Sequence, residues 1–141
     1  MVQILIGRKG SGKTKAMCDM ANTLEETVKG SIVFLSKNDR LIHDLKYRIR
    51  VVCMEDFQHI TNADEYIGFI YGIISSDNDL EYIFIDSILK HADIEIASLP
   101  AFLDRLDKIS ELYGPKFVVS LSADKEELSN LDFSKFEVLN A

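Results

Sequence analysis

Short apolar runs alternate along the chain with longer segments in which apolar residues recur at helical spacing. Apolar runs that lack polar alternation are typical of strands buried on both faces, as in a parallel sheet. Parallel strands need long crossover connections, and the helical segments between the runs would supply them. The pattern therefore predicts an α/β fold: a three-layer α/β/α sandwich around a mainly parallel sheet of about five or six strands.

The predicted elements begin and end where the apolar spacing changes or where turn residues interrupt it. The predicted strands cover residues 2–6, 31–36, 50–54, 82–86, 116–122 and, at one edge of the sheet, 136–139. The predicted helices cover residues 12–28, 41–45, 62–75, 98–113 and 124–129.

Helix ends carry recognisable residues. Asn62 and Ser98 are the expected N-terminal caps of two helices, and Gly114 is expected to end the second of them. No repeat, low-complexity tract or linker divides the 141 residues. We therefore expect a single domain over residues 1–141.

A glycine-rich loop joins the first predicted strand to the first predicted helix, and from Gly7 to Thr14 it fits the pattern G-x-x-x-x-G-K-S/T. Glycines let the backbone wrap inward, so that successive N–H groups converge on phosphate, and the following helix adds its positive N-terminal end. We therefore expect a bound nucleoside triphosphate. The residues expected to bind it are Gly7, Arg8, Lys9, Gly10, Ser11, Gly12, Lys13, Thr14 and Lys15.

Three side chains are expected to act on the phosphates and on a Mg²⁺ ion. The ammonium of Lys13 suits the β- and γ-phosphates, and the Thr14 hydroxyl is a hard oxygen ligand for Mg²⁺. Asp86 follows an apolar run at the sheet edge where ligands collect, so it is expected to hold the metal through water. A turn or capping carboxylate is the alternative for Asp86. Arg8 and Lys9 either contact phosphate or stay solvated at the loop tip, where they attract an anion.

Composition and charge narrow the classes of partner. The net charge is −7, whereas nucleic-acid binders normally carry a basic face, so we do not expect a nucleic acid as the main partner. No apolar run approaches the roughly 18 residues of a membrane span, and residues 2–6 are too few for a secretion signal. The two cysteines, Cys18 and Cys53, have no partner at metal-ligand spacing, which favours reduced thiols in a cytoplasmic protein.

With the loop, the run FIDSI around Asp86 and the run KFVVSLS over residues 116–122, the chain resembles the RecA/RadA/KaiC branch of the P-loop NTPases. The resemblance spans most of the chain, and the loop is its most specific part. It implies ATP as the nucleotide, FIDSI as the Walker B segment, and residues 116–122 as a strand between the loop strand and the Asp86 strand. Ser120 and Ser122 are then either sensors of the γ-phosphate or ordinary strand-end residues.

The chain departs from this branch where the attacking water is activated. Members that hydrolyse ATP well have a glutamate at the end of the second strand, but residues 37–39 contain none, and Ser87 rather than an acid follows Asp86. Asp39 and Glu55 are the candidate substitutes, and each is otherwise a solvated turn carboxylate.

Three functions are compatible with these features. The first is a Mg-ATP-binding protein whose hydrolysis is weak or depends on a protein partner or self-association, and which acts as a nucleotide-controlled switch. The alternative is a small-molecule, nucleoside-type kinase that transfers the γ-phosphate of ATP, although no arginine-rich lid is recognisable. The third is an interaction module that retains the loop as a relic, which the presence of Lys13, Thr14 and Asp86 argues against.

Overall fold

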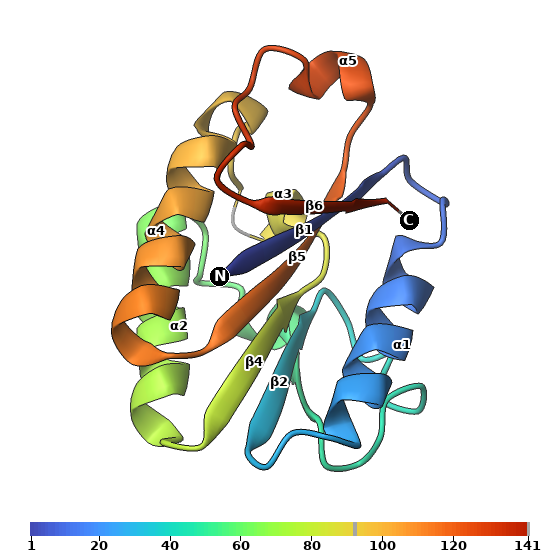
Figure 1. The fold of residues 1–141 in the computed structure, drawn as a ribbon, viewed down its shortest axis with the longest axis vertical. Helices are drawn as coiled ribbons and strands as arrows, with labels where there is room; N and C mark the ends of the chain where they lie inside the picture. The colour runs from blue at the N-terminus through green and yellow to red at the C-terminus, as the bar shows by residue number, and fades with distance from the viewer. Residues whose placement is uncertain (92, 141) are drawn as a thin grey trace.

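The computed structural model describes residues 1–91 and 93–140, and within them six parallel strands form one sheet (Figure 1). The sheet has the order β3-β2-β4-β5-β1-β6. The strands are β1 (Val2–Gly7), β2 (Ser31–Ser36), β3 (Arg50–Cys53), β4 (Leu80–Ile85), β5 (Lys116–Ser122) and β6 (Glu137–Asn140). This arrangement confirms the predicted α/β fold and the predicted edge position of the last strand.

Helices cover both faces of the sheet. One face carries α1 (Lys13–Glu25), and the other carries α2 (Ala63–Ser76) and α4 (Leu99–Tyr113) (Figure 1). The shorter helical segments are η1 (Met54–Phe57), α3 (Ile88–His91), η2 (Ile96–Ser98) and α5 (Lys125–Leu128). Because β5 lies between β1 and β4, as the resemblance implied, the carboxyl ends of these three strands meet at one edge of the sheet.

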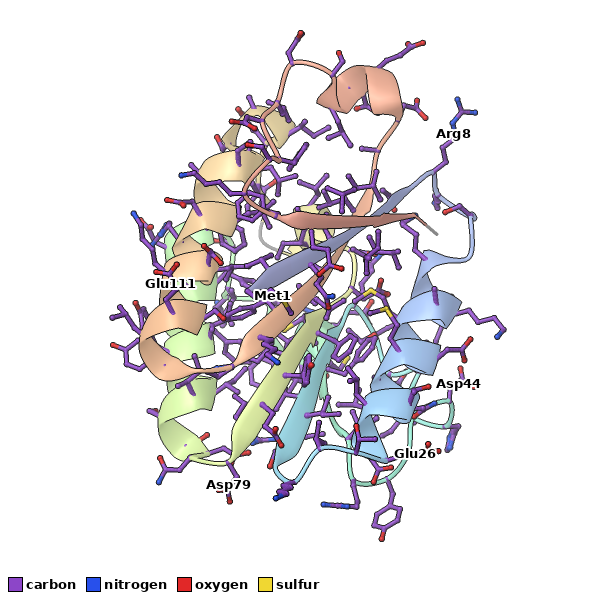
Figure 2. The ribbon with its side chains drawn as sticks, viewed as in Figure 1. Met1, Arg8, Glu26, Asp44, Asp79 and Glu111 are labelled. Atoms are coloured by element: carbon purple, nitrogen blue, oxygen red, sulfur yellow. The ribbon has the colours of Figure 1, made fainter. Side chains whose placement is uncertain are left out.

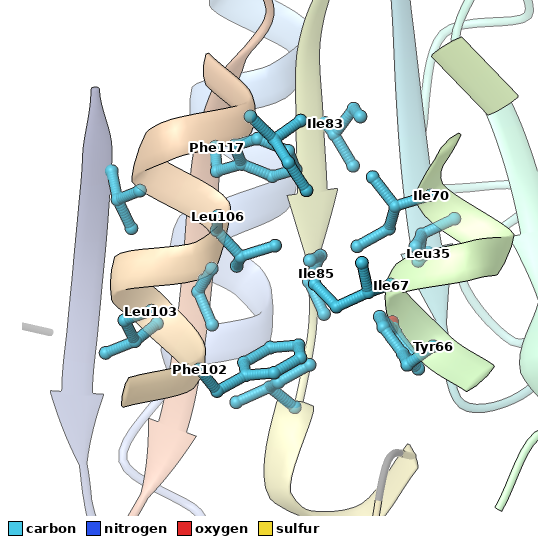
Figure 3. Packing of buried hydrophobic residues seen from close by; sticks show 14 of the residues in the cluster. Leu35, Tyr66, Ile67, Ile70, Ile83, Ile85, Phe102, Leu103, Leu106 and Phe117 are labelled. Carbon is cyan, nitrogen blue, oxygen red and sulfur yellow. The ribbon is translucent and has the colours of Figure 1, made fainter. Parts of the chain in front are cut away.

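The core consists of two apolar layers, one on each face of the sheet. Along β4, Ile83 and Ile85 belong to the layer under α2 and α4, whereas Phe84 belongs to the layer under α1. Phe84 stacks on Phe34 of β2 with 5.6 Å between ring centroids. This alternation fits the two-residue period of a strand covered on both faces. Figure 3 shows the layer under α2 and α4, which includes Tyr66, Ile70, Leu103, Leu106 and Phe117.

The two predicted helix caps differ in outcome. The Asn62 side chain accepts a hydrogen bond of 2.9 Å from the Glu65 amide, so it caps α2 as predicted. Ser98 occupies the N-cap position of α4 as predicted, but its side chain makes no capping hydrogen bond. The reason is that Ser98 is the last residue of η2, with backbone angles in the helical region rather than the extended region that a cap needs. Gly114 ends α4 as predicted, and its amide donates to the Ser110 carbonyl.

The predicted helix at residues 41–45 was wrong, because this segment consists of turns. Asn22 of α1 holds its backbone: the amide group donates to the Asp44 carbonyl, and the amide oxygen accepts from the Lys46 N–H, each at 2.9 Å. Leu45 and Ile49 are buried in the layer under α1. The apolar residues therefore serve to fasten a turn segment along α1 instead of forming a helix face.

Several boundaries also shift, and the fourth strand, predicted over residues 82–86, spans Leu80–Ile85, so that Asp86 follows the strand. The first helix, predicted to reach residue 28, ends at Glu25, and the amides of Thr27 and Val28 turn back to the Leu24 carbonyl. The third strand ends at Cys53, because the 3₁₀ helix η1 begins at Met54.

Tyr66 is a site where a substitution is expected to stabilise the fold. Its side chain is fully buried against Phe102, and within the described residues its hydroxyl has no hydrogen-bond partner. A buried polar group left unpaired costs about 1–3 kcal/mol. We therefore expect Tyr66→Phe to raise the free energy of unfolding by about 1 kcal/mol, measured by urea denaturation.

Tyr47→Phe is the matched control, because Tyr47 is 96% exposed and its hydroxyl is solvated. We expect it to change the free energy of unfolding by less than about 0.5 kcal/mol. A less stable Tyr66→Phe variant would contradict the prediction, since it would mean that the hydroxyl has a favourable partner in solution.

Candidate functional site

The loop between β1 and α1 turns sharply at two glycines. Gly10 has a φ of 84° and Gly12 a φ of 90°, both in the left-handed region that residues with a β-carbon rarely adopt. The Ser11 amide donates to the Arg8 carbonyl at 3.0 Å, which closes the turn between them. Gly12 is the N-cap residue of α1, so the loop ends directly at the positive, N-terminal end of that helix.

Lys13 is nearly buried although it is charged. Its ammonium Nζ donates to the Arg8 carbonyl at 2.8 Å, and the residue is 5% exposed. A buried ammonium group needs polar partners, because desolvation penalises an isolated charge. The backbone of the loop therefore holds the ammonium group of Lys13, which lines the adjacent cavity.

Asp86 connects three elements through its carboxylate. Thr14 of α1 donates from Oγ1 to Asp86 Oδ2 at 3.0 Å, and Ser120 of β5 donates from Oγ to Asp86 Oδ1 at 2.7 Å. The Ser120 hydroxyl in turn accepts from the Ser87 amide at 2.7 Å. Both carboxylate oxygens of a residue that is 6% exposed are thus hydrogen-bonded, so the orientation of Asp86 is set by its neighbours.

A cavity of about 400 Å³ lies between the loop and the ends of β4 and β5. It is lined by Lys9, Gly10, Gly12, Lys13, Thr14, Ser87 and Ser122. The two serines considered either as sensors of the γ-phosphate or as ordinary strand-end residues therefore differ: Ser122 lines the cavity, whereas Ser120 is fully buried and donates to Asp86.

Other residues singled out in the sequence lie away from this cavity lining. Arg8 is 84% exposed and pairs with Asp124 at 2.8 Å, and Figure 2 shows it projecting from the loop tip. Lys15 pairs with Asp19 at 2.9 Å, and the hydrogen bond that its ammonium donates to that carboxylate raises the pKa of Lys15. Asp39 and Glu55 are exposed in the segments that follow β2 and β3. Neither of these two carboxylates lines the cavity.

A second cavity of about 420 Å³ shares Thr14 with the first and extends along α1. Its other lining residues are Lys15, Cys18, Asp19, Leu41 and Asp44. Burial raises the pKa of the Cys18 thiol to about 11, and the carboxylates of Asp44, Asp86 and Asp19 raise it further in the same direction. The raised pKa favours the neutral form of the thiol, with which Cys18 lines this cavity.

The donor set fits a phosphate-bound Mg²⁺ ion. Thr14 and Asp86 offer hard oxygens next to the loop, which are the ligands that Mg²⁺ prefers, and the Thr14 proton points at Asp86, which leaves the hydroxyl lone pairs for a metal. Among the described residues, no group of three or more His, Cys, Asp or Glu side chains is placed to hold an ion. A metal here would therefore take its remaining ligands from phosphate and water.

The fold and this loop define the class of protein: a member of the P-loop NTPase superfamily, whose characteristic loop binds a nucleotide. The chain belongs to the RNA helicase family, whose model matches residues 3–81, more than half of the length. The match supports the superfamily expected from the sequence and gives no support to the RecA/RadA/KaiC branch. A comparison with curated proteins found no match.

The match covers the loop but ends before Asp86, Ser87 and Ser120. The hydrogen bonds among these residues were not predicted from the sequence. There, Ser87 was noted only because it follows Asp86 at a position where related ATPases have an acid. A polar residue near the end of a buried strand was the sequence signal for Ser120, but nothing in the sequence indicates the backbone conformation of Ser87.

Among the described residues, no helix is long and apolar enough to cross a membrane.

Proposed function

We propose that this chain, as a single domain, binds a magnesium-bound nucleoside triphosphate, ATP, in the cavity between the loop and the strand ends. The main support for the proposal is the hydrogen bond between Thr14 and Asp86, because it joins the start of α1, directly after the loop, to the carboxylate at the carboxyl end of β4. The free thiols of Cys18 and Cys53 support a reducing compartment, and we place the protein in the cytoplasm.

Each residue has a separate task in this proposal. The backbone amides of the loop and the first turn of α1 bind the phosphate oxygens, and Lys13 adds charge beside the β- and γ-phosphates. Thr14 would hold Mg²⁺ directly and Asp86 would hold it through water. The metal, when bound, neutralises phosphate charge. Ser120 keeps the carboxylate of Asp86 turned toward Thr14.

We further propose that hydrolysis is weak or depends on a partner, so that the protein acts as a nucleotide-controlled switch. Among the described residues that line the cavity there is no carboxylate, and the candidate bases Asp39 and Glu55 are exposed and do not line it. A missing general base lowers the rate by about 10² or more. A partner protein or a second copy of the chain would then supply the base or an arginine.

Calorimetric titration tests the proposal. ATP is titrated into the protein with Mg²⁺ and with a chelator, and phosphate release is followed in parallel. We expect binding that Mg²⁺ strengthens, together with little phosphate release. The absence of heat and of thermal protection at millimolar ATP would overturn the proposal, and rapid phosphate release by the protein alone would overturn its slow-turnover part.

The second candidate is a kinase, which the cavity of about 420 Å³ beside Thr14 favours. That cavity adjoins the proposed metal ligand, and Asp19 and Asp44 give it acceptors for the hydroxyl groups of a small molecule such as a nucleoside. Nucleosides that accelerate the loss of ATP without release of free phosphate would favour this candidate over the switch.

The name of the RNA helicase family associates such domains with RNA. We nevertheless do not propose RNA as a partner of this chain. The net charge of −7 supports this choice, because phosphate neutralisation supplies most of the affinity for nucleic acids. Addition of single-stranded poly(U) to the phosphate-release assay provides the test. Strong stimulation at low salt would contradict the choice and favour an RNA-dependent enzyme.

A further inference from the structure

Ser87 has a backbone conformation that few residues of its type adopt. Its φ is 59°, in the left-handed region, and it directly follows Asp86 at the end of β4. A non-glycine residue in this region is uncommon, and such strain persists where the surrounding structure enforces it, often at functional sites. The conformation of Ser87 therefore needs a structural cause.

The backbone of Ser87 is held by the buried hydroxyl of Ser120. This hydroxyl accepts the Ser87 amide at 2.7 Å and donates to Asp86 Oδ1 at 2.7 Å, while Thr14 occupies the other carboxylate oxygen. Ser120 itself is fully buried within β5. The backbone of Ser87 and the carboxylate of Asp86 are thus fixed by the same side chain.

The Ser87 side chain belongs to the wall of the cavity that faces the loop. Ser87 and Ser122 line the cavity from the strand ends. The other lining residues belong to the loop and to the start of α1: Lys9, Gly10, Gly12, Lys13 and Thr14. Within residues 1–91 and 93–140 the Ser87 hydroxyl makes no hydrogen bond. It is therefore a donor placed across the cavity from the phosphate-binding backbone.

We propose that Ser87 recognises the terminal phosphate of the bound nucleotide and makes the site selective for a triphosphate over a diphosphate. This inference rests on the proposed function. The loop holds the phosphates from one side, so the phosphate that extends farthest toward the strand ends is the terminal one. A hydroxyl donates well to a charged phosphate oxygen, and the left-handed backbone keeps it beside Asp86.

The test compares the affinities of a non-hydrolysable ATP analogue and of ADP, each with Mg²⁺, by calorimetry. In Ser87→Gly the hydroxyl is lost and the left-handed backbone is relaxed, so the variant folds without strain. Ser87→Ala lacks the hydroxyl but keeps the β-carbon. We expect both variants to bind the ATP analogue about 10- to 100-fold more weakly and to bind ADP within about two-fold of the parent.

Asp93→Gly is the matched control, because Asp93 is the other described non-glycine residue with positive φ, and it does not line the cavity. We expect it to leave both affinities unchanged. An equal loss for both nucleotides, a loss in Ser87→Ala alone, or no loss in either variant would overturn the role of Ser87. A parent protein that binds neither nucleotide would instead overturn the proposed function itself.

Discussion

Lys13→Ala is expected to weaken the binding of Mg-ATP by about 2–4 kcal/mol, which is about 30- to 1,000-fold in the dissociation constant. The ammonium group already bonds to the Arg8 carbonyl of the loop, and the residue is 5% exposed. Contacts between this charge and phosphate would therefore form with little reorganisation. Calorimetric titration of parent and variant with ATP and Mg²⁺ measures the difference.

The control for this experiment removes the same charge far from the loop. Lys29 is exposed beyond the carboxyl end of α1, so Lys29→Ala tests the effect of net charge alone. We expect it to change the ATP affinity by less than about two-fold, since exposed charges at long range are screened by salt. Unchanged affinity in Lys13→Ala would show that Lys13 does not bind the nucleotide.

Asp86→Asn is expected to abolish most of the gain in ATP affinity that Mg²⁺ provides. Asparagine has nearly the same shape, and its oxygen and amide group can still bond to Thr14 and Ser120, so the fold should persist. The substitution removes the negative charge that would hold the hydrated metal. We expect the affinity measured with Mg²⁺ to fall about 10-fold or more, and the affinity measured with a chelator to stay within about two-fold.

Asp124→Asn is the matched control, because Asp124 is a carboxylate close to the loop that pairs with the exposed Arg8 and does not line the cavity. Its response to Mg²⁺ should equal that of the parent. If Asp86→Asn also responds to Mg²⁺ like the parent, Asp86 has no role at the metal.

Much of the fold was predictable because buried parallel strands have a strong local signature. The bounds of β2 and β5 agree with those predicted, since each run of large apolar residues ends where a polar residue reaches the sheet edge. The failures occurred where tertiary contacts outweigh local preference. Residues 41–45 carry apolar residues at helical spacing, yet Asn22 bonds their backbone and α1 covers Leu45.

The sequence by itself determined the glycine loop and its place between a strand and a helix, because these features depend on residue type and local order alone. It also located Lys13, Thr14 and Asp86 as candidates. Only the tertiary structure decided how residues 72 positions apart, Thr14 and Asp86, share a hydrogen bond. The order of the strands brings β5 between β1 and β4, and Ser120 thereby fixes both the Asp86 carboxylate and the left-handed Ser87. Such contacts depend on which strands are neighbours, which local sequence patterns do not encode.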